Sequence, residues 1–373
     1  MKSIIKSTSF SFILILLFIS CERKISREDR IRRIGKPENI ILLIGDGMGL
    51  TQVSSTFYFK KDGPSNFQRF EYIGLINTSA SNSKITDSAA GATAIACGEL
   101  TYNGAIGVNN FSMPVRNIIE NVSQQGYNTG VLATSSITHA TPASFYAHTK
   151  SRGMNELIAE QLTTSDVDIF MGGGRKFFDN REDGKNMIQE LKDQHFEIYY
   201  SVNQLPNLDP KKKYGVLAAP DGLPPVHEAQ DEFLSIATKK TLNYLSSSKK
   251  PFFLMIEGSQ IDWGSHANSG EYTINEMLDF DKTIGMVLDF AEKNGKTLVL
   301  VTADHETGGM ALASNAGEEM NPDYDDLLPV FATGGHTATL IPVFALGPGA
   351  EEFAGIYKNT EIYHKIIKLL DFE

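Results

Sequence analysis

Short apolar runs rich in branched side chains recur along this 373-residue chain from Asn39 onward, and amphipathic segments with helical spacing separate them. Continuous apolar runs of this kind are typical of strands that are buried on both faces of a sheet. Their alternation with helices predicts an α/β fold, a three-layer sandwich with a mostly parallel central sheet and helices on both faces. The expected strands cover residues 40–44, 130–133, 168–171, 252–256, 297–301 and 341–345.

Apolar residues that recur three and four positions apart predict two of the helices. The first is expected over 115–122 and the second over 274–288, and each is followed by a glycine, which commonly ends a helix. Residues 201–230 and 311–335 are polar and rich in turn-forming residues, without a clear period. We expect these two segments to be excursions from a single domain.

The first residues of the chain have the pattern of a targeting signal. Two lysines precede an apolar stretch over 10–19, about half of the ~20 residues that a membrane-spanning helix needs. Ser20 and Cys21 follow, and they resemble a bacterial lipoprotein cleavage site, with plain secretion as the alternative. We therefore expect an exported, periplasmic or cell-surface protein that a lipid on Cys21 anchors to a bacterial membrane. The expected divisions are a signal peptide at 1–20, a charged tether at 21–38 and one domain at 39–373.

Charge and cysteine content narrow the function classes further. The chain has 45 acidic and 34 basic side chains and a formal net charge of −11, so no nucleic acid is expected as a specific partner. With Cys21 acylated, Cys97 has no partner for an intramolecular disulfide and is expected to be a small buried residue. The nucleophile elbow Gly-x-Ser-x-Gly and the zincin motif His-Glu-x-x-His are both absent from the sequence.

Acidic residues and a histidine follow three of the expected strands. Asp46 follows the first strand, Glu257 the fourth, and Asp304 with His305 the fifth. Any one of these acids alone fits a turn or a helix cap. Ligands of open parallel sheets, however, bind outside the carboxyl ends of the strands, so the combination predicts a ligand site at that edge.

Two sets of residues have the spacing of metal ligands. Asp262 and His266 are four residues apart, which places them on one face of a helical turn or tight loop. His336 either completes that set or is a core histidine. Oxygen and imidazole ligands without a thiolate favour zinc or a harder ion such as magnesium or manganese. The second set consists of Asp46, Asp304 and His305.

Ser88 follows Asp87 and opens a run of very small residues. In one interpretation it only begins a tightly packed helix as a capping residue. In the other, the free amides at the start of that helix face an anion, and Ser88 is a nucleophile toward phosphate. Metal ions would be needed beside it, because a serine hydroxyl barely ionises near neutral pH.

Together these motifs resemble those of the bacterial alkaline phosphatase family, whose superfamily also contains sulfatases and phosphodiesterases. The resemblance runs from about Asn39 to the C-terminus. It implies hydrolysis of phosphate monoesters to alcohol and inorganic phosphate through a phosphoserine, and it implies a homodimer. Four independent signals carry it: Asp-Ser-Ala at 87–89, Glu-x4-Asp-x3-His at 257–266, Asp-His at 304–305 and Gly-His-Thr at 335–337.

The resemblance also implies a role for each matching residue. The first zinc ion would be held by Asp262, His266 and His336. The second zinc ion would be held by Asp46, Ser88, Asp304 and His305. A third metal, usually magnesium, would be held by Asp46, Thr141 and Glu257. Arg152 would bind the phosphate oxygens, and Asp87 would orient the guanidinium of that arginine.

Two residues depart from the enterobacterial pattern of the family. His139 stands where an aspartate supports the third metal, so this site is expected to hold either magnesium or zinc. Trp263 replaces a lysine near the phosphate, and the loss of that positive charge predicts weaker binding and faster release of phosphate.

Other functions remain as alternatives. They are a phosphodiesterase of the same superfamily, a sulfatase, and a zinc-binding lipoprotein without catalytic activity. Residues 97–101 do not match the Cys/Ser-x-Pro-x-Arg motif of sulfatases, which disfavours that function. The histidines expected to be non-catalytic are His148, His195, His227 and His364.

Overall fold

A ten-stranded sheet forms the centre of the computed structural model, which describes residues 35–229, 232–315 and 324–372. The strand order is β14-β2-β13-β8-β1-β7-β3-β4-β6-β5. β13 is antiparallel to both of its neighbours, and the other pairings within this sheet are parallel. The strands are β1 Asn39–Gly45, β2 Tyr72–Asn77, β3 Asn128–Ser136, β4 Ile169–Gly173, β5 Phe196–Tyr199, β6 Lys213–Leu217, β7 Phe252–Gly258, β8 Thr297–Thr302, β13 Ile341–Leu346 and β14 Gly355–Lys358.

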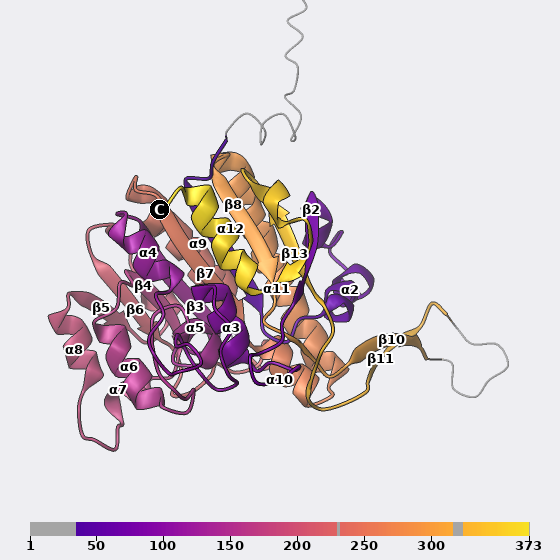
Figure 1. Ribbon diagram of the computed structural model, residues 1–373, viewed down its shortest axis with the longest axis horizontal. Helices are drawn as coiled ribbons and strands as arrows, with labels where there is room; N and C mark the ends of the chain where they lie inside the picture. The colour runs from indigo at the N-terminus through magenta and orange to yellow at the C-terminus, as the bar shows by residue number, and fades with distance from the viewer. Residues whose placement is uncertain (1–34, 230–231, 316–323, 373) are drawn as a thin grey trace, which may run out of the picture.

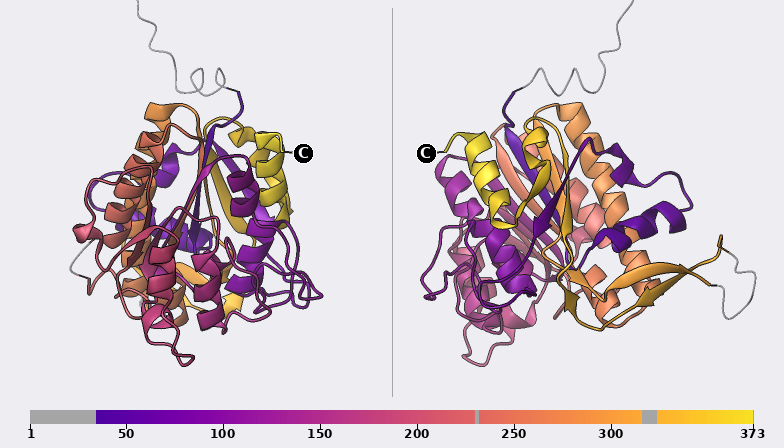
Figure 2. Two further views of the ribbon diagram at one scale, coloured as in Figure 1. Left: turned by 90° about the vertical axis from the view of Figure 1, so that its left-hand side faces the viewer. Right: turned by 45° about the vertical axis from the view of Figure 1, so that its right-hand side comes forward.

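Helices cover both faces of the sheet (Figure 1). Figure 2 shows α9 and α11 on one face and α3, α4 and α12 on the other, with the sheet between them. The predicted three-layer α/β fold is therefore confirmed. The helices are α2 Leu50–Phe59, α3 Ser88–Cys97, α4 Ile118–Gln124, α5 Ala140–Ala143, α6 Asn155–Thr163, α7 Lys176–Asp179, α8 Met187–Asp193, α9 Phe233–Ser247, α10 Gln260–His266, α11 Gly270–Asn294 and α12 Thr360–Leu370.

The three central strands form the core of the molecule. β1 lies between β8 and β7, so that Ile40 is next to Leu298 on one side and Phe253 on the other. All three strands are buried along their whole length. Burial of each large apolar side chain contributes roughly 1.5–3 kcal/mol, so the carboxyl ends of these strands form a rigid base for the residues that follow them.

The helix expected over 115–122 begins at Ile118 instead. Asn117 caps it, because its side-chain oxygen accepts a hydrogen bond from the Glu120 amide at 3.0 Å. The Glu120 carboxylate in turn accepts a hydrogen bond from the Asn117 amide at 2.8 Å. This reciprocal capping box fixes the start of α4 more strongly than the apolar Val115 upstream of it.

One of the two segments expected to be excursions, 201–230, contributes a strand to the central sheet, which corrects that prediction. β6 lies within 201–230 and pairs with β4 and β5 in the central sheet. Within 311–335, β10 (Met310–Ser314) and β11 (Leu327–Phe331) form an antiparallel hairpin that projects from the body (Figure 1). β6 contains a glycine and β11 a proline, and both residues weaken the sequence signal of a strand.

The described chain enters the body at the edge of the sheet opposite α10 (Figure 1). The predicted signal peptide, Cys21 and most of the predicted tether lie outside the described residues. Among the residues that are described, no helix combines the length and the hydropathy needed to cross a bilayer.

Candidate active site

Adjacent strands deliver the acidic residues to one edge of the sheet. Asp46 follows β1, Glu257 lies near the end of β7, and Asp304 and His305 follow β8. Because β1 lies between β8 and β7, the three strand ends are neighbours. These four residues therefore lie together at the carboxyl edge, where the sequence predicts a ligand site.

Ser88 begins α3 and points toward this edge. Its Oγ lies 3.5 Å from Asp46 Oδ1 and 3.2 Å from His305 Nε2. Asp87 caps the helix by accepting a hydrogen bond from the Ala90 amide at 3.0 Å. A Cβ atom at Gly91 would lie 2.9 Å from the backbone oxygen of Asp304, so the small residues of α3 allow close packing against the strand end. The serine is thus both the first helical residue and part of the site.

Asp262, His266 and His336 form a first group, the open cluster. The two imidazole Nε2 atoms are 3.1 Å apart, and they lie 3.3 Å and 3.7 Å from Asp262 Oδ1. Each histidine Nδ1 faces a backbone oxygen, that of Gly334 at 2.7 Å for His266 and that of Thr86 at 2.8 Å for His336. Nδ1 is therefore the protonated nitrogen, and the two Nε2 lone pairs converge on one point, as metal ligands do.

Asp46, Asp304 and His305 form a second group, the buried cluster, in which all three side chains are fully buried. His305 Nε2 lies 3.4 Å from Asp46 Oδ1 and 3.3 Å from Asp304 Oδ2. One oxygen of each aspartate, Oδ2, has no hydrogen-bond partner among the described residues. Buried polar atoms are rarely left in this state without a ligand, so the geometry fits a bound cation.

A third cluster joins Asp46 to His139 and Glu257. Glu257 Oε2 accepts hydrogen bonds from Ser259 at 2.6 Å and from Ser135 at 3.2 Å. The atoms Glu257 Oε1, Thr141 Oγ1 and His139 Nδ1 are buried and without a hydrogen-bond partner in the part of the chain that the structure describes. These donors also fit a metal ion, with oxygen atoms predominating.

Charge repulsion and burial perturb the pKa values of these groups. Burial raises the pKa of Asp46 well above its usual range, and the neighbouring carboxylates of Asp304, Asp262 and Glu257 raise it further. Burial is also the main reason that the pKa of Glu257 rises to about 8, and that the pKa of His305 falls to about 3. Several carboxylates and neutral imidazoles packed in one buried site require compensating cations.

Arg152 extends the site on the side of α3. Its guanidinium lies 3.2 Å from Asp87 Oδ2 and 3.1 Å from His139 Nε2. Asp87 Oδ2 also accepts a hydrogen bond from the Gly104 amide at 3.0 Å, which fixes the carboxylate that faces the guanidinium. Trp263 lies beside the third cluster, with its ring edge-to-face with His139 at 6.1 Å between centroids. Both residues are therefore next to the clusters, as expected.

Three side chains that contact residues of the clusters were not predicted from the sequence. Ser135 and Ser259 bond Glu257, as described above. Thr307 donates a hydrogen bond to Asp262 Oδ1 at 2.5 Å, and its Oγ1 lies 3.3 Å from His305 Nδ1. Thr307 thereby contacts the open cluster and the buried cluster together. Only the position of Thr307, two residues after His305, could have indicated this role from the sequence.

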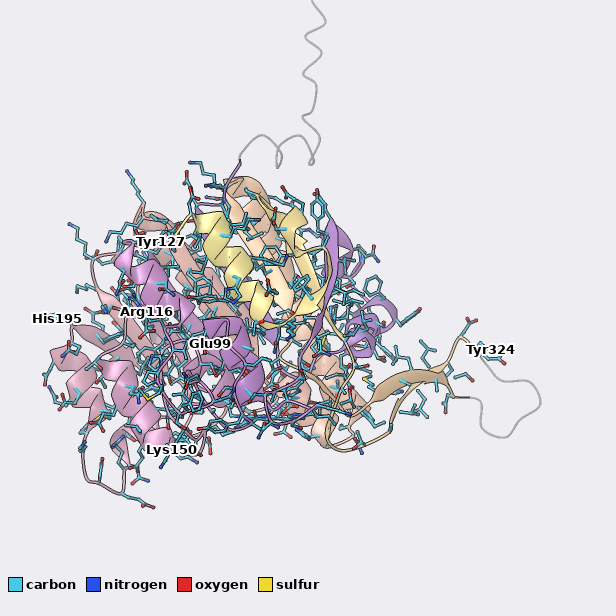
Figure 3. All side chains as sticks on the ribbon, in the orientation of Figure 1. Glu99, Arg116, Tyr127, Lys150, His195 and Tyr324 are labelled. Atoms are coloured by element: carbon cyan, nitrogen blue, oxygen red, sulfur yellow. The ribbon has the colours of Figure 1, made fainter. Side chains whose placement is uncertain are left out.

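The remaining histidines lie outside the three clusters. His148 contacts the backbone oxygen of Gly107 at 2.6 Å and Glu120 at 3.1 Å, and His364 contacts the backbone oxygen of Gly98 at 3.0 Å. Figure 3 places His195 at the left side of the molecule, beyond α8. That these histidines are non-catalytic stays a prediction.

A serine at a helix N-terminus, surrounded by convergent carboxylates and imidazoles, is typical of metal-dependent hydrolases of phosphate esters. The family model described as alkaline phosphatase matches residues 37–327. Alkaline phosphatase 3 of Bacillus subtilis is 31% identical over 94% of this chain and 91% of its own length. Among solved structures, the alkaline phosphatase of the Antarctic bacterium TAB5 is 50% identical with a TM-score of 0.87, over 91% of this chain and 99% of that one. A cold-active alkaline phosphatase from Shewanella sp. is 30% identical with a TM-score of 0.79, over 89% and 99%.

This chain belongs to the alkaline phosphatase family, and it is a phosphatase. The family is metal-dependent, in agreement with the three clusters of ligand atoms. Family membership also argues against the alternative of a zinc-binding lipoprotein without catalytic activity.

Proposed function

We propose that the protein hydrolyses phosphate monoesters through a phosphoserine at Ser88. The observation that carries this proposal is the placement of Ser88 Oγ at the N-terminus of α3, within 3.5 Å of both Asp46 and His305. A hydroxyl at this position faces the positive end of a helix and the ligands of the buried cluster at once. Phosphate monoesters are the substrates that a phosphatase family implies.

The donor atoms favour two zinc ions and a third metal. Asp262, His266 and His336 would hold the first zinc ion. Asp46, Asp304, His305 and Ser88 would hold the second zinc ion. Asp46, Thr141 and Glu257 would hold the third metal, with His139 beside them. When bound, such metals supply the positive charge that lowers the pKa of a hydroxyl group and neutralises phosphate oxygens.

The residues of the chain account for the chemical steps. Ser88 Oγ attacks phosphorus, the bond to the ester oxygen breaks, and the alcohol leaves. Water then attacks the phosphoserine, the bond from Oγ to phosphorus breaks, and inorganic phosphate leaves with Ser88 restored. Arg152 holds the phosphate oxygens, and Asp87 keeps its guanidinium in place. Phosphoryl transfer depends mainly on such positioning and charge stabilisation.

The third metal is either magnesium or zinc. Two variants of the TAB5 enzyme, in which a histidine is replaced by glutamate or aspartate, have magnesium bound in a site termed M3. In this chain His139 offers an imidazole nitrogen beside Asp46 and Glu257, which favours zinc more than an all-oxygen site would. Metal analysis of the purified protein distinguishes the two ions.

The decisive experiment compares p-nitrophenyl phosphate with bis(p-nitrophenyl) phosphate at alkaline pH. We expect turnover of the monoester to exceed that of the diester, to be lost after chelation, and to return with zinc and magnesium. Faster turnover of the diester would favour a phosphodiesterase instead. Monoester turnover that survives complete chelation would contradict the assignment of the clusters to metals.

Assembly as a homodimer is supported by an exposed apolar surface on α2. Leu50, Phe57 and Tyr58 are 49%, 46% and 67% exposed, and Leu50 also lines a hollow together with Met310 and Leu340. Light scattering should therefore give twice the mass of one chain. Phe57→Glu should yield monomers, because it places a charge in the contact.

The proposed lipid anchor agrees with where the described chain begins. β1 begins at Asn39 and ends next to Asp46 of the site, so the chain enters the sheet at the end opposite the site, and an anchored chain would direct the site away from the membrane. Mass spectrometry of the mature N-terminus tests this proposal. A mature chain that begins with acylated Cys21 would support it, whereas an unmodified N-terminus would indicate plain secretion and a domain at 39–373 without an anchor.

A further inference from the structure

A cavity of about 380 Å³ lies beside α10, and none of the residues of the three clusters lines it. Its walls come from α9, from α11, from residues 223–229 and from residues 200–202. Most of the wall is apolar, but two acidic side chains of α11, Glu276 and Asp279, also line it. The apolar lining residues include Tyr200, Val202, Leu223, Val226, Phe233 and Leu234.

Both acidic side chains have unused capacity to accept hydrogen bonds. Glu276 is only 4% exposed, and its Oε1 accepts a hydrogen bond from the Val226 amide at 2.7 Å. Its Oε2 and the carboxylate of Asp279 accept none from the described residues. The nearby Lys282 ammonium group lies 2.5 Å from Glu232 and is therefore already paired. The cavity therefore places two carboxylates beside an apolar wall, a combination that suits a ligand with one cationic and one apolar end.

Burial raises the pKa of both carboxyl groups. It raises the pKa of Glu276 to about 8 and the pKa of Asp279 to about 6. The charged forms are therefore poorly solvated in this cavity, and a cation that enters it would gain strong electrostatic stabilisation.

The wall of the cavity is held in place by Gln260, the first residue of α10. Its side-chain amide donates to the backbone oxygens of Thr134 at 3.1 Å and Leu223 at 2.8 Å. Its Oε1 accepts a hydrogen bond from the Tyr272 hydroxyl at 2.5 Å. Since these bonds already exist in the protein alone, little ordering is needed when a ligand binds.

We propose that this cavity binds a small organic amine, a primary alkylammonium ion. Its ammonium group donates hydrogen bonds to Glu276 and Asp279, and its apolar chain packs against residues such as Leu223 and Phe233. A hydrated divalent metal ion fits less well, because most of the wall offers no oxygen ligands. The site is separate from the phosphatase clusters, so its occupancy does not depend on the proposed function.

The test is a calorimetric titration of the metal-loaded protein with n-pentylammonium chloride at pH 9. At this pH an aliphatic ammonium group is still charged, because its pKa is close to the ~10.4 of lysine. Pentan-1-ol has the same shape but is neutral. We expect the ammonium ion to bind at least roughly tenfold more tightly than the alcohol, since hydrogen bonds to charged groups are the stronger ones. Equal affinity for the two would overturn the proposal.

Matched variants of α11 locate the site. Glu276→Gln keeps an oxygen that can accept from the Val226 amide and removes the charge, so affinity for n-pentylammonium should fall at least roughly tenfold. Glu271→Gln makes the same change at an exposed residue of the same helix outside the cavity, and its affinity should equal that of the wild type. If Glu276→Gln does not fold, Asp279→Asn takes its place. Wild-type affinity in the folded cavity variants would refute the assignment.

Discussion

The open cluster and the buried cluster share one edge of the sheet but differ in their contact with solvent. Asp46, Asp304 and His305 are fully buried, whereas the His266 side chain in the open cluster is 39% exposed. The residues of the buried cluster lie just beyond the carboxyl ends of β1 and β8, two of the central strands. Asp262 and His266 of the open cluster belong to α10, and His336 belongs to β12 (His336–Thr337), which pairs with β9 (Glu306–Thr307) in a separate two-stranded sheet.

This difference separates two tasks within the proposed mechanism. The buried cluster contacts Ser88 and can hold the nucleophile in one position. The open cluster is accessible to water and to a departing alcohol, and it can exchange these groups. A site that was uniformly buried would hinder product release, and one that was uniformly exposed would weaken the electrostatic effect of its charges.

The largest effect is expected from Ser88→Ala. Removal of the nucleophile should lower kcat for monoesters by at least about 10⁴-fold, in line with other nucleophile deletions. The ligands of both clusters remain, apart from the Ser88 hydroxyl. Metal content should therefore stay close to that of the wild type. Steady-state kinetics measure the loss of kcat, and elemental analysis measures the metal content.

A loss of metal from Ser88→Ala equal to its loss of activity would mean that the serine acts only as a ligand. A variant that retained most of its activity would remove the phosphoserine from the mechanism.

Limited chelation tests the contrast between the clusters directly. We expect the ion of the open cluster to leave first, with a loss of activity of about 10²–10³-fold, because a bound cation contributes several kcal/mol of charge stabilisation. The melting temperature should fall mainly in a later phase, when the buried cluster loses its ion. Activity, metal content and melting temperature are followed in the same samples, and zinc should restore all three.

His266→Ala provides the control for this experiment, because it removes a ligand of the open cluster in advance. Its first phase should be absent, while the later fall in melting temperature should persist. A single phase in the wild type, with activity and stability lost together, would show that exposure does not separate the two clusters.

Thr307→Val should weaken zinc binding, with an effect smaller than those of the two experiments above. Thr307 donates a hydrogen bond to Asp262 and contacts His305, so it orients one ligand of each cluster. Valine has nearly the same shape without the hydroxyl group. Residues that orient metal ligands typically change metal affinity or activity by ~10–100-fold, and we expect the loss of zinc affinity to fall in this range. Titration of the metal-free variant with zinc measures it.

Ser259→Ala serves as the comparison for Thr307→Val, because it removes one hydrogen bond to Glu257 in the third cluster. It should affect the third metal and leave zinc affinity close to wild type. Equal effects of the two variants on zinc would show that the supporting hydroxyl groups do not distinguish the clusters.

Strand ends and short spacings in the sequence could predict the positions of several residues of the clusters. Asp46 and Asp304 directly follow buried apolar runs, and one helical turn separates Asp262 from His266. The supporting side chains could not be predicted in this way. Ser135 reaches Glu257 only because the register of β3 on β7 sets Ala133 beside Glu257. Isolated serine and threonine residues carry no pattern that encodes such a pairing.

In the fold, too, the elements with a strong sequence pattern could be predicted, and those that depend on pairing could not. Continuous apolar runs identified the central strands, which are buried on both faces. β6 was missed although Tyr214 and Val216 are buried, since Lys213 and Gly215 interrupt its apolar character. Strands near the sheet edge are defined by their partners more than by their own composition, and a single sequence does not reveal these partners.

The smallest expected effect concerns Trp263, which lies on α10 between Asp262 and His266 of the open cluster in the sequence. Its ring packs edge-to-face on His139, and a Cβ atom at Gly222 would lie 2.4 Å from it, so the indole fills its space closely. Trp263→Lys should add a positive charge near the phosphate and lower the inhibition constant for inorganic phosphate by up to about tenfold. Trp263→Phe keeps an aromatic ring without a charge and should leave that constant near the wild-type value. If both variants shift it equally, packing and not charge controls how long phosphate stays bound at the open cluster.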